Sequence, residues 1–344
     1  MNKVCFFDTK PYDKVYFDQM KEQFGIEIEY FETKLGPKTA FMAKGFEAAV
    51  AFVNDVIDKQ TIDILYDCGV RILAMRSAGY NNIDFKAAYG KIHVVRVPAY
   101  SPYAVAEHAM ALLLTLNRKI HRAYSRTREF NFSLNGLIGF DLHGKTVGVV
   151  GTGKIGQVFI DICKGFGMNI LAYDPFPIKD SDIHYVSFEE LCRESDIISL
   201  HCPLTKDTFH MINDKTIQLM KQGVYIINTS RGALIQAEDL LNAIKDEKIG
   251  GACLDVYEEE TELFYEDMSY AIIQDDVLSR LISMPNVLVT SHQAFFTKEA
   301  LYNIAETTLT NLRDYFDGKV LENEICYQCT KGENCPRDKN QRCF

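Results

Sequence analysis

The feature that most constrains this chain is a glycine-rich turn that reads GTGKIG. Its glycines, Gly151, Gly153 and Gly156, have the spacing G-x-G-x-x-G; the apolar run Thr146–Val150 precedes them and the helical pattern Lys154–Phe166 follows. In this setting the first glycine allows a tight turn, the second lets the backbone approach a pyrophosphate, and the third lets helix and strand pack closely. The unpaired N–H groups at the start of the helix favour a bound anion. The turn therefore predicts a dinucleotide-binding site.

An acidic residue after the next strand indicates which dinucleotide is bound. Asp174 follows the strand candidate Asn169–Tyr173 and lies 23 residues after Gly151. A carboxylate at this distance accepts hydrogen bonds from the ribose hydroxyls of the adenosine. It would also repel the 2′-phosphate of NADP, so we expect NAD as the cofactor. The alternative for the turn taken alone is a structural turn without a ligand.

Strands alternate with helices in two series. The strands expected in the first hundred residues are Lys3–Phe7, Ile26–Phe31, Ala48–Val53, Ile72–Arg76 and His93–Val97. Those expected in the second series are Thr146–Val150, Asn169–Tyr173, Ile197–His201, Val224–Asn228, Gly251–Leu254 and Val287–Thr290. Such alternation predicts βαβ units and parallel sheets. We expect an α/β protein with a doubly wound Rossmann NAD-binding domain and a second, flavodoxin-like substrate domain.

Two helices mark the expected domain boundaries. Ser101 as N-cap and Pro102 in the first turn open a long helical segment that begins the NAD-binding domain, residues 101–297. A last helix runs from Thr297 to about Phe316 and is expected to return to the substrate domain, which would comprise residues 1–100 and 298–344. The long segment carries an apolar stripe that either forms a dimer interface or packs within its own chain, at Val105, Ala109, Leu112 and Leu116.

Composition excludes several classes of partner. The chain has 344 residues, of which 47% are hydrophobic, so it can bury a sizeable core without metal or disulfide cross-links. Its net charge of -10 argues against nucleic acid and against an anionic membrane surface. No run approaches the roughly 20 apolar residues of a membrane span, and the N-terminal apolar run is too short for a signal peptide. We expect a cytoplasmic protein with neither a nucleic-acid nor a membrane partner.

The ten cysteines fall into two groups. Six occur singly in apolar surroundings and are expected to be small buried hydrophobes, namely Cys5, Cys68, Cys163, Cys192, Cys202 and Cys253. The other four form a C-x2-C-x5-C-x7-C tail at Cys326, Cys329, Cys335 and Cys343. Four thiolates can hold zinc or an iron–sulfur cluster, but the last spacing is long for a zinc site. We expect a redox-labile or unpaired tail without metal, which an assay for bound zinc and iron decides.

Three further segments place ionisable residues just after strands. They are IINTSRGALI with Arg231, GACLDVYEEE with Asp255 and Glu260, and VLVTSHQAFF with His292. Singly, each has a structural interpretation: a satisfied histidine, an arginine that caps a turn, and a solvated acidic run at Glu258–Glu260. Together, at the strand ends where open α/β sheets bind ligands, they suit reduction of a 2-oxoacid. A histidine donates the proton, a carboxylate keeps it protonated, and a guanidinium grips the substrate carboxylate.

The chain resembles the D-isomer-specific 2-hydroxyacid dehydrogenases over nearly its whole length. The spacings of 29 residues from Arg231 to Glu260 and 32 from Glu260 to His292 are similar to that family's Arg–Glu–His triad. The resemblance implies that Arg231 binds the substrate carboxylate and polarises the ketone, that His292 donates the proton and that Glu260 orients His292. It further implies that Asp255 lies near the nicotinamide. The other residues that it implies around the cofactor are Lys154, Ile155, Cys202, Pro203, Thr208, Thr229 and Ser230.

Within the family the resemblance is strongest to the D-lactate dehydrogenases. It lies in the segments RSAGYNNID, VPAYSPYAVAEHA, IQDDVLSRL and SHQAFFTKEAL. It implies that the backbone around Ala78 and Gly79 receives the substrate carboxylate, and that aromatic residues wall the pocket, at Phe52, Tyr100 and Phe295. A crowded aromatic pocket suits a small methyl ketone such as pyruvate. Plain core packing is the alternative for these aromatic residues, above all for Phe52.

The resemblance thus implies reduction of pyruvate by NADH to D-lactate, and two alternatives stay open. A bulkier 2-oxoacid, branched or aromatic, would require the aromatic walls to leave more room. A non-catalytic NAD-sensing protein would keep its full biological effect in a His292→Ala variant. The resemblance also implies a homodimer or a dimer of dimers through the NAD-binding domain. Closure of the domains over the substrate is expected, with hinges near Ala99–Ser101 and Phe295–Lys298.

Overall fold

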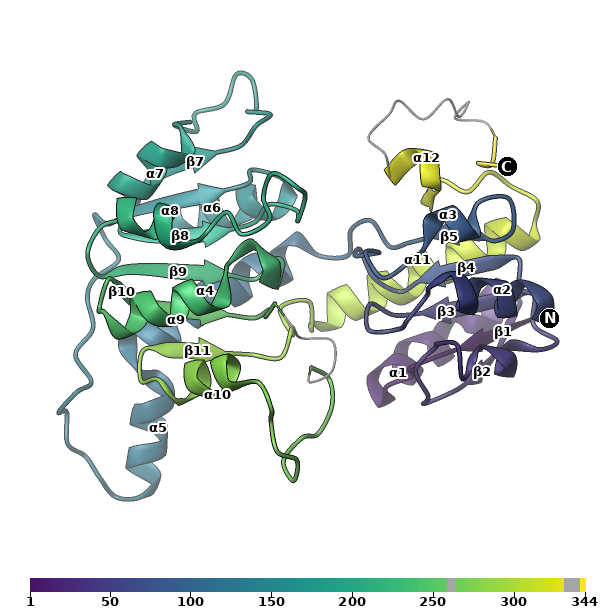
Figure 1. Ribbon diagram of the computed structural model, residues 1–344, viewed down its shortest axis with the longest axis horizontal. Coiled ribbons are helices and arrows are strands. Elements are labelled where there is room, and N and C mark those ends of the chain that lie inside the picture. The colour runs from purple at the N-terminus through teal and green to yellow at the C-terminus, as the bar shows by residue number, and fades with distance from the viewer. Residues whose placement is uncertain (259–263, 331–340) are drawn as a thin grey trace. The chain divides into compact units, whose positions relative to one another are not determined.

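The computed structural model describes residues 1–258, 264–330 and 341–344 (Figure 1). The chain divides into two compact units, each built on a six-stranded sheet. Unit 1 comprises Met1–Ser101 and Thr297–Phe344, and unit 2 comprises Pro102–Phe296. The predicted α/β class is confirmed. No described helix combines the length and apolar character that crossing a membrane demands.

The sheet of unit 1 has the order β12-β5-β4-β3-β1-β2. Its parallel strands are β1 (Asn2–Phe6), β2 (Ile26–Tyr30), β3 (Ala48–Ala51), β4 (Ile72–Met75) and β5 (His93–Val95). The short β12 (Glu324–Ile325) pairs antiparallel with β5. The order β2-β1-β3-β4-β5 is that of flavodoxin-like sheets, as predicted.

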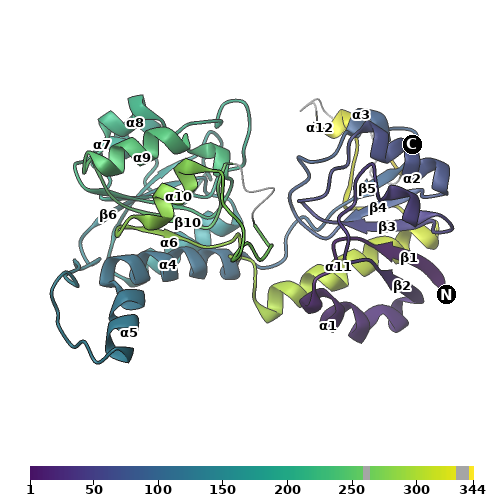
Figure 2. The ribbon, with the colours of Figure 1, turned by 60° about the horizontal axis from the view of Figure 1, so that its bottom comes forward.

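Helices cover both faces of this sheet. Figure 2 shows α1 (Pro11–Met20) and α11 (Lys298–Phe316) together on one face. There α11 buries Ala305, Leu309 and Leu312, whose spacing puts them on one side of a helix. The opposite face carries the other elements of the unit: α2 (Lys59–Cys68), α3 (Phe85–Ala88) and the 3-10 turn η2 (Ala40–Ala43). The turn η1 (Lys21–Phe24) follows α1, and α12 (Tyr327–Thr330) follows β12.

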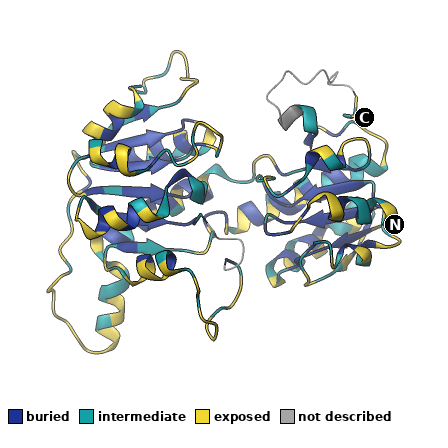
Figure 3. Cartoon of the chain, in the orientation of Figure 1, coloured by how far each residue is buried: buried dark blue, intermediate teal, exposed yellow. Residues whose placement is uncertain are grey.

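The sheet of unit 2 is entirely parallel, with the order β11-β10-β9-β8-β6-β7. Its strands are β6 (Thr146–Val150), β7 (Asn169–Tyr173), β8 (Ile197–Leu200), β9 (Val224–Asn228), β10 (Ile249–Leu254) and β11 (Val287–Val289). The four central strands are almost wholly buried, whereas the edge strands β7 and β11 are partly exposed (Figure 3). The strand order reverses at β6, which has β7 on one side and β8 on the other. In doubly wound sheets the ligand crevice lies beyond the carboxyl end of the strand at such a reversal.

Two layers of helices enclose this sheet. One face packs against α4 (Pro102–Arg118) and α6 (Lys154–Gly165). The other packs against α7 (Phe188–Glu194), α8 (Asp214–Leu219), α9 (Ala237–Lys245) and α10 (Asp276–Ser283). A short 3-10 turn, η3 (Gly232–Leu234), follows β9.

The long helical segment expected after Ser101 is broken in two. The break is at Lys119, whose φ of 51° lies in the left-handed region, and α5 (Ile120–Arg128) begins after it. The apolar stripe of α4 packs within its own chain, because none of its residues is more than 4% exposed: Val105, Ala109, Leu112 and Leu116. The interpretation of this stripe as a dimer interface is therefore wrong.

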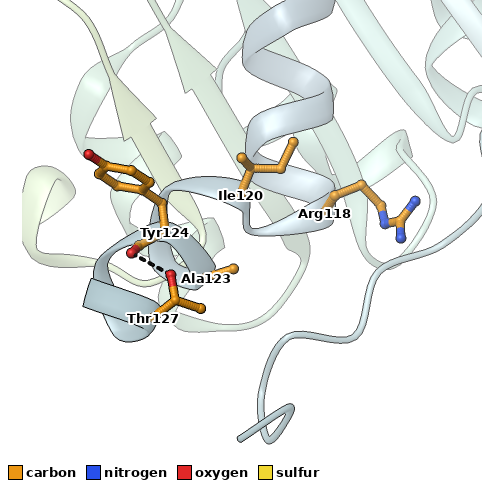
Figure 4. A pocket seen from close by; sticks show the side chains of 5 residues that line it. All are labelled: Arg118, Ile120, Ala123, Tyr124 and Thr127. Carbon is orange, nitrogen blue, oxygen red and sulfur yellow. Dashed lines mark hydrogen bonds between the residues drawn. The ribbon is translucent and has the colours of Figure 1, made fainter. Parts of the chain in front are cut away.

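A run of exposed apolar residues of unit 2 lies instead on α5 and the loop that follows it. No residue of α5 is buried, and the helix stands out from the body of the unit (Figures 1 and 2). Large apolar side chains are exposed along this segment, which we call the α5 arm, at Ile120, Tyr124, Phe130, Phe132, Leu134 and Ile138. A hollow of about 500 Å³ lies where α4 ends and α5 begins, and it is lined by Arg118, Ile120, Ala123, Tyr124 and Thr127. Figure 4 shows these side chains.

The single cysteines are unpaired thiols. Five of them are buried and Cys68 is half-buried. Burial raises the pKa of Cys202 to about 11 and that of Cys163 to about 12, so both stay protonated, as expected of small hydrophobes. In the tail, Cys326 is buried and Cys343 half-buried, while Cys335 and the side chain of Cys329 lie outside the described residues. Among the described residues, no three His, Cys, Asp or Glu side chains gather as a metal site would require.

Candidate active site

The glycine-rich turn of unit 2 has the geometry that its sequence predicts. Gly151 follows β6 with a φ of 91°, and a Cβ there would lie 2.7 Å from the backbone nitrogen of Cys202. A Cβ on Gly156 would lie 2.0 Å from the carbonyl oxygen of Gly151, so only glycine lets α6 approach the turn. By contrast, a Cβ on Gly153 would meet nothing within 4 Å. Gly153 is the N-cap of α6, so the open space lies beside the unpaired backbone N–H groups of the first turn of the helix. These groups can bind an anion.

Asp174 is fixed against this turn. One oxygen of its carboxylate accepts hydrogen bonds from the amide and hydroxyl of Thr152, at 2.8 and 3.1 Å. The other oxygen accepts from the amide of Phe176 at 2.8 Å. The hydroxyl of Tyr185 donates to Thr152 at 2.9 Å. The carboxylate that the sequence singles out is therefore held at the carboxyl ends of β6 and β7.

The loops after β8 and β9 are tied together. The hydroxyl of Ser230 donates to the carbonyl of Cys202 at 2.6 Å, and that of Thr208 donates to the carbonyl of Pro203 at 2.7 Å. The hydroxyl of Thr229 is buried and has no hydrogen-bond partner in the described part of the chain. At the start of α6, Lys154 is exposed and Ile155 half-buried. An orphaned hydroxyl and the open space before Gly153 fit a dinucleotide in this crevice.

Arg231 lies in the loop after β9, directly before η3, with its backbone anchored. The buried Asn228 donates from its side-chain amide to the carbonyl of Arg231 at 2.9 Å and accepts from the amide of Ser230 at 3.1 Å. One guanidinium nitrogen donates to the carbonyl of Ser230 at 2.6 Å. Within the described residues no carboxylate pairs with this half-buried guanidinium, so its remaining N–H donors can serve a ligand.

His292 lies after β11 in a strained backbone conformation. Its φ is 53°, in the left-handed region that side chains rarely adopt. Its amide donates to the carbonyl of Asp255 at 2.7 Å, and its carbonyl accepts from the hydroxyl of Tyr265 at 3.0 Å. The ring of Tyr265 lies 6.0 Å from the imidazole, centre to centre. Such strain persists only where the surroundings fix the turn, and it is common at active sites.

Asp255 has a structural task that the sequence did not predict. Its side chain is 0% exposed, and its carboxylate accepts from the Thr290 hydroxyl at 2.5 Å and from the amides of Gln293 and Ala294 at 2.9 and 2.8 Å. Burial acts to raise the pKa of Asp255, but hydrogen bonds from His108, Thr290 and Gln293 outweigh burial and hold it below its usual value. The residue is an ionised anchor for the turn that carries His292. Its expected place beside the nicotinamide remains a prediction.

The acidic run after Asp255 is only partly described. Glu258 is half-buried: it pairs with Nε2 of His210, and it accepts from the amide of Ala237 at 3.4 Å. Glu260, the predicted partner of His292, lies outside the described residues, so its role stays a prediction. Sequence reasoning missed His210, because nothing around it in the sequence marks it as the partner of a residue 48 positions away.

In unit 1, Ala78 and Gly79 follow β4. Their carbonyls are hydrogen-bonded, that of Ala78 to the guanidinium of Arg96 at 2.8 Å and that of Gly79 to the hydroxyl of Ser77 at 2.9 Å. No described residue accepts a hydrogen bond from either amide. Successive unpaired amides form a concavity that suits an anion such as a carboxylate. Tyr100 lies near the end of Met1–Ser101, the first segment of unit 1, and its carbonyl accepts a hydrogen bond from Asn303 of α11 at 2.6 Å.

The predicted aromatic walls differ in their surroundings. Phe52 is 4% exposed, and the guanidinium of Arg76 lies 3.9 Å from its ring centre, which favours the core-packing interpretation. Phe295 of unit 2 is 9% exposed and packs edge-on against Phe296, with ring centres 5.9 Å apart. Arg76 itself is buried between Asp8 and Asp13, with nitrogen–oxygen distances of 3.8 and 3.4 Å. This buried charge cluster was not predicted, although Arg76 opens one of the family-like segments.

Comparison with known proteins agrees with this architecture. Residues 110–294 match the family described as D-isomer specific 2-hydroxyacid dehydrogenase, NAD binding domain. The chain is 51% identical to D-lactate dehydrogenase of Escherichia coli strain K12 over 327 residues, covering 94% of this chain and 99% of that protein.

Solved structures show the same likeness. The apo-structure of the Escherichia coli D-lactate dehydrogenase superposes with a TM-score of 0.86 at 49% identity, covering 94% of this chain and 99% of that one. The pyruvate reductase of Chlamydomonas reinhardtii superposes with a TM-score of 0.89 at 42% identity, covering 94% and 98%. Near-complete coverage at such identity leaves no doubt about ancestry. The chain belongs to the D-isomer specific 2-hydroxyacid dehydrogenase family, and its residues 110–294 form that family's NAD-binding domain.

Proposed function

We propose that this protein is an NAD-dependent D-lactate dehydrogenase that reduces pyruvate to D-lactate. The observation that carries the proposal is 51% identity, over 94% of the chain, to a relative that is named for this activity. The site supports it, because the turn that presents His292 and the loop that presents Arg231 both leave carboxyl ends of strands in the sheet that carries the glycine turn.

Arg231 grips the carboxylate of pyruvate and polarises its ketone. A guanidinium binds a carboxylate bidentately, and Arg231 has no competing carboxylate in the described part of the chain. In unit 1, the unpaired amides of Ala78 and Gly79 are donors that suit a carboxylate, as the family resemblance implies. Tyr100 and Phe295 are the apolar walls that the resemblance implies.

His292 donates the proton that the ketone oxygen needs as the carbon is reduced. Bound NADH supplies the hydride, so pyruvate, NADH and one proton give D-lactate and NAD. A histidine donor suits this step near neutral pH. Glu260 is proposed to orient the imidazole, as the family resemblance implies. The anchoring of the His292 turn by Asp255 keeps the donor in one place, which matters because small misplacements cost much of the rate.

The cofactor is held by the predicted crevice of unit 2. The amides at the start of α6, from Gly153 to Gly156, take the pyrophosphate, and Asp174 takes the ribose hydroxyls of the adenosine. Thr208, Thr229 and Ser230 offer hydroxyls along the loops after β8 and β9, and Cys202 and Pro203 offer apolar contact.

A comparison of substrates tests the proposal. We expect kcat/KM with NADH to be highest for pyruvate, lower for 2-oxoisocaproate and lowest for phenylpyruvate. Phe295 is 9% exposed and packs edge-on against Phe296, so this proposed wall cannot easily move to admit a larger side chain. A higher kcat/KM for phenylpyruvate than for pyruvate would reject the assignment to lactate and favour an aromatic 2-oxoacid.

The protein is also proposed to act as a homodimer in the cytoplasm. The family resemblance implies assembly through the NAD-binding domain, and the α5 arm is an exposed apolar surface of that domain. The free thiols support the proposed cytoplasmic location, since every cysteine recorded among the described residues is unpaired.

A further inference from the structure

The buried carboxylate of Asp255 joins the turn that carries His292 to a helix far away in the sequence. Its oxygens accept three hydrogen bonds from the segment 290–294, and its backbone carbonyl accepts the amide of His292 itself. The other group at the carboxylate is the imidazole of His108, from the middle of α4. Nε2 of His108 lies 3.3 Å from Oδ1 of Asp255 and 3.2 Å from Oγ1 of Thr290.

The roles of donor and acceptor in this cluster follow from the chemistry of its members. The ionised Asp255 can only accept hydrogen bonds. The Thr290 hydroxyl has one proton, which it donates to Asp255 at 2.5 Å, so its oxygen is left to accept. Nε2 of His108 therefore carries a proton and donates it toward both oxygens. A neutral imidazole in this tautomer is enough, and its other nitrogen is not needed.

Helix α4 gives this donor a rigid base. Ala109 and Leu112 on the same helix are 0% and 4% exposed and belong to the core between α4, α6 and the sheet. The His108 side chain is 18% exposed, so water competes little for its hydrogen bond. The contact with Asp255 thus ties a strained, solvent-facing turn to the buried frame of unit 2.

We infer that His108 is a positioning residue for the proposed reduction: through Asp255 and Thr290 it holds the backbone turn from which His292 acts. The inference rests on the proposed function for its kinetic meaning. Removing the donor leaves a buried carboxylate short of a hydrogen bond, which is costly, and the strained turn relaxes. The guanidinium of Arg231, which is proposed to bind the substrate, and the glycine turn lie on other loops. Pyruvate and NADH should therefore still bind.

The test compares two replacements of His108. The amide nitrogen of glutamine lies as many bonds from Cα as Nε2 of histidine, so His108→Gln keeps the donor, whereas His108→Leu fills the space without one. We expect kcat for pyruvate to fall about 10- to 100-fold in His108→Leu. The KM for pyruvate and the Kd for NADH should stay within about twofold. His108→Gln should recover most of kcat.

A matched control and a second variant sharpen the kinetics. His184→Leu makes the same change at an exposed position of unit 2 and should leave all three constants unchanged. If His108→Leu does not fold, His108→Asn replaces it, because the shorter amide cannot reach the carboxylate. Wild-type kcat in the variant without a donor overturns the inference. So does a parallel loss of NADH affinity, which would mean general collapse of the unit.

Hydrogen exchange separates this inference from the proposed function. The amides of Gln293 and Ala294 donate to Asp255, so a peptide covering 290–296 should exchange faster in His108→Leu than in wild type. Peptides from β6 should exchange at unchanged rates. If the wild-type protein does not reduce pyruvate, the proposed function is wrong. The exchange measurement then still tests whether the contact between His108 and Asp255 holds the turn. Unchanged exchange at 290–296 overturns the inference whatever the substrate.

Discussion

Buried polar side chains set the geometry of the site in unit 2. Asp255 and Asn228 are both 0% exposed, and each holds the backbone of the loop that presents a proposed catalytic side chain. Buried polar groups normally satisfy their hydrogen bonds, so these residues hold their loops in one conformation. Arg231 and His292 are thereby presented by backbone that is fixed before a substrate arrives.

The proton donor is the most direct target among single side chains. Replacing His292 by Asn removes the proposed acid, and we expect kcat for pyruvate to fall by roughly 10²–10⁴-fold. The Kd for NADH, measured by its fluorescence, should change little, because His292 is not among the residues proposed to hold the cofactor. A His292→Asn enzyme with more than a tenth of wild-type kcat would contradict the assigned role.

His201 makes stability depend on pH. Burial lowers the pKa of this imidazole to about 3, where it packs against Phe159 and hydrogen-bonds to Ser199 at 2.8 Å. In the unfolded chain its pKa is about 6.5, so below that pH only the unfolded chain takes up the proton. The stabilisation is therefore complete above pH 6.5 and is lost as pH falls toward 3.

The loss at His201 can be isolated by substitution. At pH 4.5 it should amount to about 2–3 kcal/mol relative to pH 7.5. His201→Gln keeps a polar group but does not titrate, so its urea-unfolding midpoint should fall less between these two pH values. Equal falls in the two proteins would show that the His201 imidazole does not carry this dependence.

Local sequence patterns located the residues that act through one short segment. Gly151, Gly153 and Asp174 lie where the motif predicts, because a turn between a strand and a helix is a local structure. His108 and His210 could not be found in this way. Each acts through a partner brought close only by the fold, so its own segment does not show which residue it contacts.

Strands and helices, too, were predicted where one segment determines the structure. The parallel strands were predicted to within a few residues, because continuous apolar runs between turn residues are distinctive. The two-residue β12 was missed, because it is too short to show a pattern and its Glu324 is a buried charge. The fold provides this carboxylate with His93 at 2.6 Å and with the amide of Cys343 at 2.8 Å. The break at Lys119 was missed because neither glycine nor proline marks it.

The α5 arm is the element whose function is most open to test. We expect the double variant Ile120→Asp/Tyr124→Asp to weaken the proposed dimer at least 100-fold, because it puts two charges on an apolar contact surface. Sedimentation velocity across a concentration series measures this. Phe176→Asp is the matched control, since Phe176 is 86% exposed elsewhere in unit 2. A variant that dimerises like wild type would exclude this surface as the interface.

At the level of the whole chain, unit 1 is assembled from two distant segments. Helix α11 packs on the sheet formed by the first hundred residues, with Leu309 0% exposed beside strands β1, β3 and β4. The last segment is therefore needed to complete the core of the first. The match of the family's NAD-binding domain to residues 110–294 falls entirely within unit 2.

This arrangement predicts which strands lose stability when a core side chain of α11 is shortened. Leu309→Ala should destabilise unit 1 by about 2–4 kcal/mol, because it leaves a cavity in a buried cluster. Hydrogen exchange should accelerate in β1, more than 300 residues earlier in the chain, and not in β6. The exposed Glu306→Ala on the same helix serves as control. Acceleration in β6 as well would mean that the two units unfold together.

The stereochemistry of the product tests the proposed activity most directly. Purified protein should oxidise NADH when pyruvate is added, and each NADH consumed should yield one molecule of lactate. Chiral chromatography of that lactate should give the D-enantiomer alone. L-lactate, or no oxidation of NADH at any pyruvate concentration, would contradict the account.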